Sequence, residues 1–282
     1  MIETWQALCL ALLQGLTEFL PISSSAHLVF PSLLLGWPDQ GLAFDVAVHV
    51  GTLLAVVLYY RRDLLAMAGG CLRAAAQRQA NDDARLVLWL ALATLPAVVV
   101  GFLGKDLIEN HLRSLPVIAT TTLVFGLLLG LAEWRARRAS AAADSPGAGG
   151  GGASRWRPLS LGVALLVGLA QALAPVPGVS RSGVTLTAGL LLGLSRQAAA
   201  RLSFLLSIPV IAGAGLLKVL DLIEAGDAVN WAQLALASLT AGLVAYACIA
   251  AFLRLLDRVG LMPFVWYRVV LAALLYGVWL SL

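Results

Sequence analysis

The chain has 282 residues, of which 60% are hydrophobic and only 12% are charged, and its formal net charge is +4. Its mean hydropathy is +0.90, whereas charged residues make up roughly a quarter of a typical soluble domain. This composition excludes a soluble globular domain, and apolar runs spread over the whole length indicate a polytopic membrane protein. The small positive charge requires no nucleic-acid partner, and Cys9, Cys71 and Cys248 lack the spacing of metal ligands.

The first apolar region, Thr4 to Leu35, is interrupted by polar and ionisable residues between Gln14 and His27. Such side chains are tolerated in a bilayer when they face protein or a water-filled cavity, so the cluster indicates a functional site. A single intramembrane Ser or His would more often be a helix-packing contact. Pro21 and Pro31 are expected to divide the region, because proline breaks a helix and frees backbone groups. The pattern predicts a re-entrant helical hairpin over about residues 4–36.

Six further apolar runs are each near the roughly 20 residues that cross a bilayer. Three follow the first hairpin, and three follow a second interrupted region, predicted as a hairpin over about residues 159–195. An arginine-rich loop is expected at 61–85, and the Ala-, Gly- and Ser-rich segment 139–154 is predicted to be a flexible linker. The fold class is therefore all-α and polytopic. The six predicted spans are about Phe44–Tyr60, Leu86–Leu103, Val117–Ala132, Phe204–Leu220, Trp231–Leu253 and Pro263–Leu282.

The two halves, 1–138 and 155–282, resemble each other in residues as well as in hydropathy. Gly15-Leu16-Thr17-Glu18 corresponds to Gly168-Leu169-Ala170-Gln171, and Ser23 to Leu28 corresponds to Ser180 to Thr185. A re-entrant hairpin plus three spans gives each half an odd number of crossings. The sequence therefore predicts two repeats that are inverted relative to each other in the membrane.

Loop charges fit this inverted topology. With both hairpins re-entrant, one side of the membrane has 14 Lys or Arg against 5 Asp or Glu, and the other has 3 basic and 7 acidic residues. The positive-inside rule places the basic side in the cytoplasm. Both termini and the mouth of the first hairpin are then predicted to lie outside, and the second hairpin enters from the cytoplasm.

The second interrupted region carries an intramembrane arginine, Arg181, among serines and glycines. Glycines let a ligand approach the backbone, a serine-capped helix start offers free N–H groups to an anion, and the guanidinium is a planar fork suited to phosphate oxygens. Two such loops meeting in the bilayer would form a small anion site for an amphiphile with an anionic headgroup. The substrate-binding residues predicted from both loops are Gln14, Ser23, Ser25, Gly178, Ser180, Ser182 and Gly183.

Several polar residues also have plainer interpretations. Arg181 and Glu18 could form a purely structural buried ion pair, although such a pair needs no glycine-flanked hydroxyls. Arg268, near the end of the last span, is expected to extend into the headgroup layer. His49 has no evident partner, and Asp45 lies at a span end where a carboxylate can be solvated.

Two long motifs identify a family resemblance. The first is Gln14-x-x-x-Glu18 followed by Phe19-Leu20-Pro21-Ile22-Ser23-Ser24-Ser25-Ala26-His27, and the second is Pro177-Gly178-Val179-Ser180-Arg181-Ser182-Gly183. They resemble the two signatures of the bacterial undecaprenyl-diphosphatase family, also called bacitracin-resistance proteins, and the resemblance covers nearly the whole chain. The departures are mild: Gln14 stands at a Glu-or-Gln position, Ala26 stands where glycine is usual, and the linker is longer than expected.

The resemblance implies hydrolysis of undecaprenyl diphosphate to undecaprenyl phosphate and inorganic phosphate in the bacterial inner membrane. This reaction renews the lipid carrier for cell-wall synthesis and confers bacitracin resistance. Arg181 would hold the diphosphate. Ser24 is predicted to be the nucleophile or to place the attacking water, with Ser23 or Ser25 as alternatives, and His27 to be its base or the acid for the leaving group. Glu18 would orient His27, activate water or help to hold a divalent cation, Mg²⁺ or Ca²⁺.

Two other classes of function stay open at this point. Broken helices in inverted repeats are also a transporter architecture, so a polyprenyl-phosphate transporter or flippase is the alternative, and transport is compatible with hydrolysis. A structural membrane protein is the third class, which the intramembrane Arg and Glu disfavour. The expected partners are the lipid substrate and membrane lipids. A homodimer is a further alternative, because small residues on several spans permit close helix contacts within one chain or between two.

Overall fold

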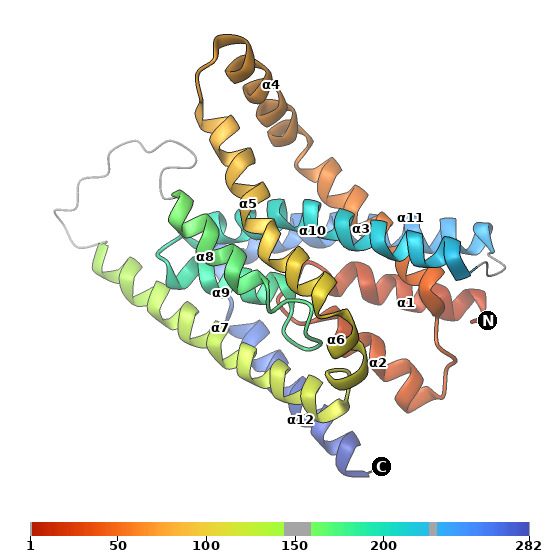
Figure 1. The fold of residues 1–282 in the computed structure, drawn as a ribbon. Coiled ribbons are helices and arrows are strands. Elements are labelled where there is room, and N and C mark those ends of the chain that lie inside the picture. The colour runs from red at the N-terminus through yellow and green to blue at the C-terminus, as the bar shows by residue number, and fades with distance from the viewer. Residues whose placement is uncertain (1, 144–158, 226–229, 282) are drawn as a thin grey trace.

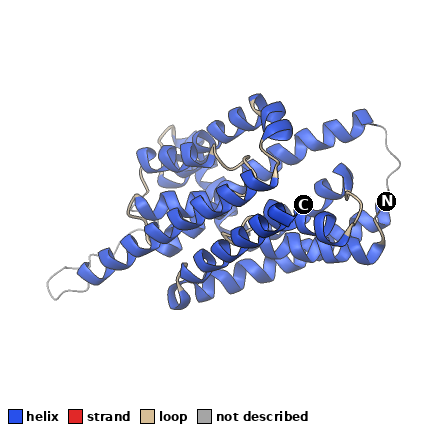
Figure 2. Ribbon diagram, turned by 90° about the horizontal axis from the view of Figure 1, so that it is seen from below, coloured by secondary structure: helices blue, strands red, loops and turns tan. Residues whose placement is uncertain are grey.

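The computed structural model describes residues 2–143, 159–225 and 230–281, and over these ranges the chain folds entirely into helices and their connections (Figures 1 and 2). The long helices lie in a bundle, and the connection between α4 and α5 projects beyond it (Figure 1). The helices are α1 (Thr4–Thr17), α2 (Ser24–Leu35), α3 (Gly41–Tyr59), α4 (Arg61–Gln77), α5 (Asp82–Leu103), α6 (Lys105–His111), α7 (Leu115–Ala143), α8 (Leu161–Gln171), α9 (Arg181–Leu191), α10 (Arg196–Ala225), α11 (Trp231–Val259) and α12 (Met262–Ser281).

Six helices in the described ranges are long and apolar enough to cross a membrane: α3, α5, α7, α10, α11 and α12. Each coincides with one of the predicted spans, which confirms a multi-pass, all-helical membrane protein. Many large apolar side chains on these helices are exposed, as contact with lipid requires. The helices α10 and α11 are longer than predicted, because α10 begins at Arg196 and α11 continues to Val259.

Some local expectations were wrong. The region 61–85 is mostly helical, because α4 and the start of α5 occupy it, and α6 lies in the connection between α5 and α7. Pro31 does not divide the first region, since α2 continues through it and ends at Gly36, whose φ of 64° suits glycine. Of the predicted linker 139–154, the first five residues belong to α7 and the remainder lies outside the described residues.

Both interrupted regions are broken helices, as predicted. The first break lies between α1 and α2, and the second lies between α8 and α9. The serines that precede α2 and α9, Ser23 and Ser180, have φ angles of 71° and 68°. A non-glycine residue in this part of φ/ψ space costs of order 1–3 kcal/mol, and such residues cluster at functional sites. Corresponding positions of the two halves thus share the same strained backbone conformation.

Two corresponding glycines let broken helices approach their neighbours closely. A methyl group at Gly15 would lie 2.7 Å from the carbonyl oxygen of Ala241 in α11, and one at Gly168 would lie 2.3 Å from that of Ala93 in α5. Helix α1 therefore packs on α11, and α8 packs on α5, with little more than backbone between them. In each case a broken helix of one half contacts a spanning helix of the other half.

A buried ion-pair network also joins the two halves. The side chain of Glu133 in α7 is 0% exposed, and it accepts hydrogen bonds from Arg196 Nε and Nη2 in α10, both at 2.9 Å. Arg137 Nε, one turn further along α7, donates to the same carboxylate at 2.7 Å. A carboxylate at this depth requires such cationic partners, so the network fixes α7 against α10.

Replacing Glu133 by alanine is expected to lower the free energy of unfolding by about 3 kcal/mol, because it removes the carboxylate that compensates a largely buried Arg196. Asp82→Ala is the matched control. Its ion pair with Arg85 is 3.9 Å long and well exposed, and such pairs contribute little. Thermal unfolding of the two purified variants in detergent measures the difference, and equal melting temperatures would contradict a stabilising network.

Candidate functional site

The two helix breaks meet at a buried ion pair. Arg181 Nη2 donates to Glu18 Oε1 at 3.1 Å, and the two side chains are 10% and 9% exposed. The other carboxylate oxygen, Oε2, accepts hydrogen bonds from Gln14 Nε2 at 2.9 Å and from Ser24 Oγ at 3.3 Å. Three of the predicted site residues therefore converge on the carboxylate of a fourth. The guanidinium also donates to the backbone oxygen of Ser203 in α10 at 3.2 Å, which orients it toward the first break.

Backbone and hydroxyl contacts bind the two turns to each other. The Gly178 N–H donates to Ser25 Oγ at 3.2 Å, and Ser182 Oγ donates to the carbonyl oxygen of Leu20 at 2.8 Å. Ser180 caps α9 by accepting from the Gly183 N–H at 3.1 Å, so the start of this helix is formed as predicted. The breaks are therefore a single polar unit built from distant parts of the chain.

The two glycines of the second motif are packed against protein. Gly178 has a φ of 89°, and a methyl group there would lie 2.1 Å from Thr121 Oγ1 of α7. A methyl group at Gly183 would lie 2.8 Å from Arg268 Nη1. Glycine at both positions thus admits neighbouring side chains to the turn, in addition to any ligand.

Arg268 corrects the expectation from sequence most clearly. Instead of extending into the headgroup layer, its side chain is 0% exposed and lies behind both turns. It donates to the carbonyl oxygens of Gly178 and Val179 in the second turn, at 2.8 and 3.1 Å, and to that of Pro21 in the first turn at 3.4 Å. A further bond reaches Thr122 of α7 at 3.0 Å. The planar five-donor guanidinium is the one side chain that can bind so many carbonyls.

His27 lies beside the site but is not bonded to Ser24 or Glu18. Its Nδ1 is 2.7 Å from the carbonyl oxygen of Ser23, which can only accept, so Nδ1 carries the proton. Its Nε2 is 2.6 Å from the hydroxyl of Tyr267 in α12, which then donates to it. Tyr267 was missed by the sequence analysis, because a contact between residues 240 positions apart has no local signal.

A second histidine reaches the site through Gln14. His49 Nδ1 donates to the carbonyl oxygen of Asp45 at 2.7 Å, and its Nε2 lies 3.4 Å from Gln14 Nε2, whose second proton it can accept. The amide of Gln14 therefore connects His49 with Glu18. Asp45 itself forms an ion pair with Lys218 of α10 at 3.0 Å and is not merely solvated. The contact of His49 with Gln14 and the ion pair of Asp45 with Lys218 were not predicted from the sequence.

The surroundings of Glu18 offer few ligand atoms for a divalent cation. Within the described ranges, no three His, Cys, Asp or Glu residues come together as a metal-binding group. The oxygen atoms at hand are those of Glu18 and Ser24 and the buried Oε1 of Gln14, which accepts no hydrogen bond from the described residues. This set matches Mg²⁺ sites in which one carboxylate acts together with substrate phosphates.

The fold and these contacts define a class: a multi-pass membrane protein with a buried polar site where two broken helices meet. Residues 7–274 match the family described as bacitracin resistance protein BacA, and the chain belongs to this family. It is 58% identical over 280 residues to the undecaprenyl-diphosphatase of Alcanivorax borkumensis, covering 99% of this chain and 100% of that protein. It is 54% identical over 276 residues to the undecaprenyl-diphosphatase of Colwellia psychrerythraea, covering 95% of this chain and 96% of the relative.

Arg268→Lys is expected to loosen both turns, because one ammonium with three donors cannot replace five guanidinium N–H groups. Hydrogen exchange of the backbone amides in 18–23 and 177–182 should become faster, together with a lower melting temperature. Arg254→Lys on the exposed surface of α11 is the matched control and should change neither. Unchanged exchange in the Arg268 variant would mean that the turns hold their shape without this residue.

Proposed function

We propose that this protein is an undecaprenyl-diphosphatase, which hydrolyses undecaprenyl diphosphate to undecaprenyl phosphate and inorganic phosphate. The observation that carries the proposal is the convergence of Arg181, Glu18 and Ser24, from two separate helix breaks, inside an apolar protein. This set supplies a cation for phosphate oxygens and a hydroxyl, each within hydrogen-bond distance of the same carboxylate. Membership of the family and the names of both relatives support the same activity.

Binding of the diphosphate would begin with an exchange of partners at Arg181. Its guanidinium now binds Glu18, and a phosphate likewise offers two oxygens that a guanidinium can bind, with more negative charge than a carboxylate. Hydroxyls of Ser23, Ser25, Ser180 and Ser182 and the amides at the start of α9 surround the headgroup in this proposal. Positioning and charge stabilisation supply most of the catalysis in phosphoryl transfer, so a rigid and largely buried site is well suited to it.

Glu18 is the base that the geometry favours for Ser24. Ser24 Oγ already donates its proton to Glu18 Oε2, so the oxygen would form a bond to the terminal phosphorus while the carboxylate takes the proton. Undecaprenyl phosphate leaves as the phosphoanhydride bond breaks, and water then releases phosphate from the serine. Alternatively, the Ser24 hydroxyl positions a water molecule that attacks the phosphorus. Ser23 or Ser25 could take the role of Ser24 in either case.

His27 has a different position in this mechanism from the one expected. Because Nδ1 is bonded to Ser23 and Nε2 to Tyr267, we assign it first to holding the turn that carries Ser24. Its Nε2 can receive or return a proton through the Tyr267 hydroxyl, which keeps a role as acid for the leaving group. A Mg²⁺ or Ca²⁺ ion, where used, would be held by Glu18 and Gln14 with the phosphates of the lipid and would supply further charge stabilisation.

We also propose the finer topology. The two halves of the chain, the first ending with α7 and the second containing α8 to α12, form two inverted repeats, each a re-entrant hairpin plus three spans. The matched φ angles of Ser23 and Ser180 and the matched contacts of Gly15 and Gly168 support the repeat. Loop charges support a bacterial inner-membrane orientation with the arginine-rich ends in the cytoplasm and both termini and the mouth of the first hairpin in the periplasm.

Phosphate release from undecaprenyl diphosphate by purified protein tests the activity. Arg181→Ala, Glu18→Ala and Ser24→Ala are each expected to lower kcat at least about 100-fold, as loss of a transition-state partner does, and His27→Ala to lower it less. Thr240→Ala, on the surface of α11, is the control. If neither the wild-type protein nor any variant releases phosphate, the transporter alternative is favoured. Repeating the assay with a chelator tests whether a divalent cation is required.

Thiol labelling of intact cells tests the orientation. In a variant without the native cysteines, a cysteine at Asp39 is expected to react with a membrane-impermeant reagent, because the proposed topology places it in the periplasm. A cysteine at Arg258 should react only after the cells are opened. Labelling of both in intact cells would contradict the proposed orientation.

A further inference from the structure

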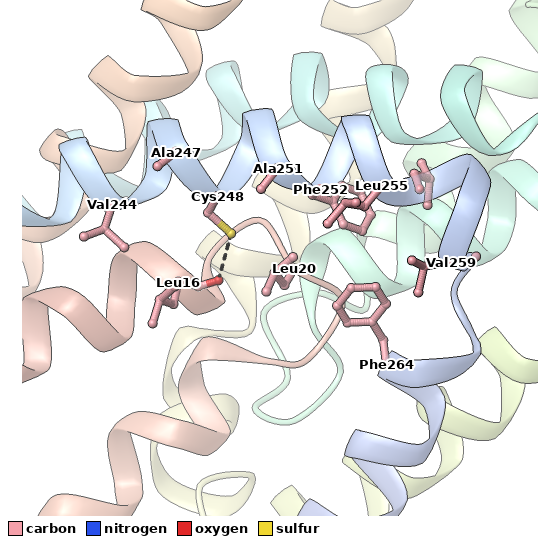
Figure 3. Close-up of a pocket in the computed structure, with 12 residues that line it drawn as sticks. Leu16, Leu20, Val244, Ala247, Cys248, Ala251, Phe252, Leu255, Val259 and Phe264 are labelled. Atoms are coloured by element: carbon pink, nitrogen blue, oxygen red, sulfur yellow. Dashed lines mark hydrogen bonds between the residues drawn. The ribbon is translucent and has the colours of Figure 1, made fainter.

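An apolar groove runs along α11 beside the first helix break. Its volume is about 450 Å³, and none of its lining residues is charged. Figure 3 shows its two walls: α11 on one side, and α1 with the following turn on the other, with Phe264 of α12 at one end. The thiol of Cys248 donates to the carbonyl oxygen of Leu16 at 3.4 Å and holds the two walls together (Figure 3).

Small residues on α11 create the hollow. Ala247 and Ala251 lie four positions apart, on one face of the helix, and both are exposed. Lining residues extend along α11 from Val244 to Val259, which at 1.5 Å per residue is about 22 Å of groove. A groove of this length and composition suits an extended hydrocarbon chain rather than a compact ligand.

The groove adjoins the diphosphate site at two points. Leu20 lines it and belongs to the turn that leads to Ser24, and its carbonyl oxygen accepts the bond from Ser182. Phe264 lines it too, and Tyr267, which binds His27, lies one turn further along α12. A molecule with its headgroup at the site therefore has an apolar channel next to that headgroup.

We propose that this groove binds the first isoprene units of the polyprenyl tail, and that it makes the protein selective for long prenyl diphosphates. The inference rests on the proposed function, and it extends that function from the headgroup to the tail. Burial of each added isoprene unit contributes apolar contact until the groove is filled, and later units lie in the bilayer. Affinity should therefore rise with tail length and then level off.

A large side chain in the groove tests the proposal. Ala251→Phe places a ring where the tail would lie, and because Ala251 is exposed the ring need not displace the core. Ala235→Phe, at an exposed position of α11 outside the groove, is the matched control. Phosphate release is measured for geranyl, farnesyl, geranylgeranyl and undecaprenyl diphosphates in one detergent. For undecaprenyl diphosphate, KM should rise about tenfold in Ala251→Phe with kcat nearly unchanged, and the dependence of KM on tail length should flatten.

The outcomes separate the two proposals. No release by the wild-type protein from any substrate would overturn the proposed function. Wild-type activity with the same dependence on tail length in Ala251→Phe and Ala235→Phe would overturn the tail groove alone. A changed oligomeric mass of Ala251→Phe with unchanged KM would assign the groove to a second copy of the chain instead. If Ala251→Phe fails to fold, the wild-type protein is labelled with a diphosphate lipid that carries a photoreactive group near its headgroup. Labelling at the groove-lining residues of 244–259 is expected. Labelling only at residues on the opposite face of α11 would overturn the tail groove.

Discussion

The pairing of Glu18 with Arg181 is the constraint on which the site depends. Either charge alone within an apolar bundle would be strongly unfavourable, so the two have to meet although they lie in different helix breaks. Other features follow from this requirement. Gly15 and Gly168 bring the broken helices close to their neighbours, and Ser23 and Ser180 hold strained turns that direct the helices α2 and α9 to one point.

The same pair explains why the arrangement is suited to chemistry as well as to stability. A purely structural ion pair would use both carboxylate oxygens on cations, as Glu133 does with Arg196 and Arg137. Glu18 instead shares one oxygen with Arg181 and offers the other to Gln14 and a hydroxyl. A carboxylate bound in this way retains a proton-accepting position next to a hydroxyl, and the cation beside it can take an anionic partner. The contrast between these two carboxylates separates a candidate site from a structural network.

Sequence predicted what depends on composition and local pattern. The spans followed from apolar length, and Glu18, Ser24 and Arg181 were expected at one site because isolated charges are unfavourable in a bilayer. Helix α4 was mistaken for a loop because its arginines were interpreted as a charged connection between two spans, although its apolar and polar residues lie on different faces of a helix. The surroundings of Arg268 and His27 could not be predicted from the chain, since Arg268 binds carbonyls of a distant turn and His27 binds a tyrosine of a distant helix. Charge chemistry is thus visible in a sequence, whereas the depth of a side chain depends on tertiary packing.

Arg268 adds a positive charge behind the turns, and in the described part of the chain its hydrogen-bond partners are backbone carbonyls. With Arg181 and Glu18 it leaves the site one positive charge in excess. Under the proposed function, the anionic headgroup of the lipid would balance this excess positive charge when it binds. A ligand that binds only the native state stabilises that state, and the stabilisation grows with the logarithm of the free ligand concentration above its Kd. Lipid diphosphate would then stabilise the two turns and the helices that carry them, in addition to being the molecule on which the site acts.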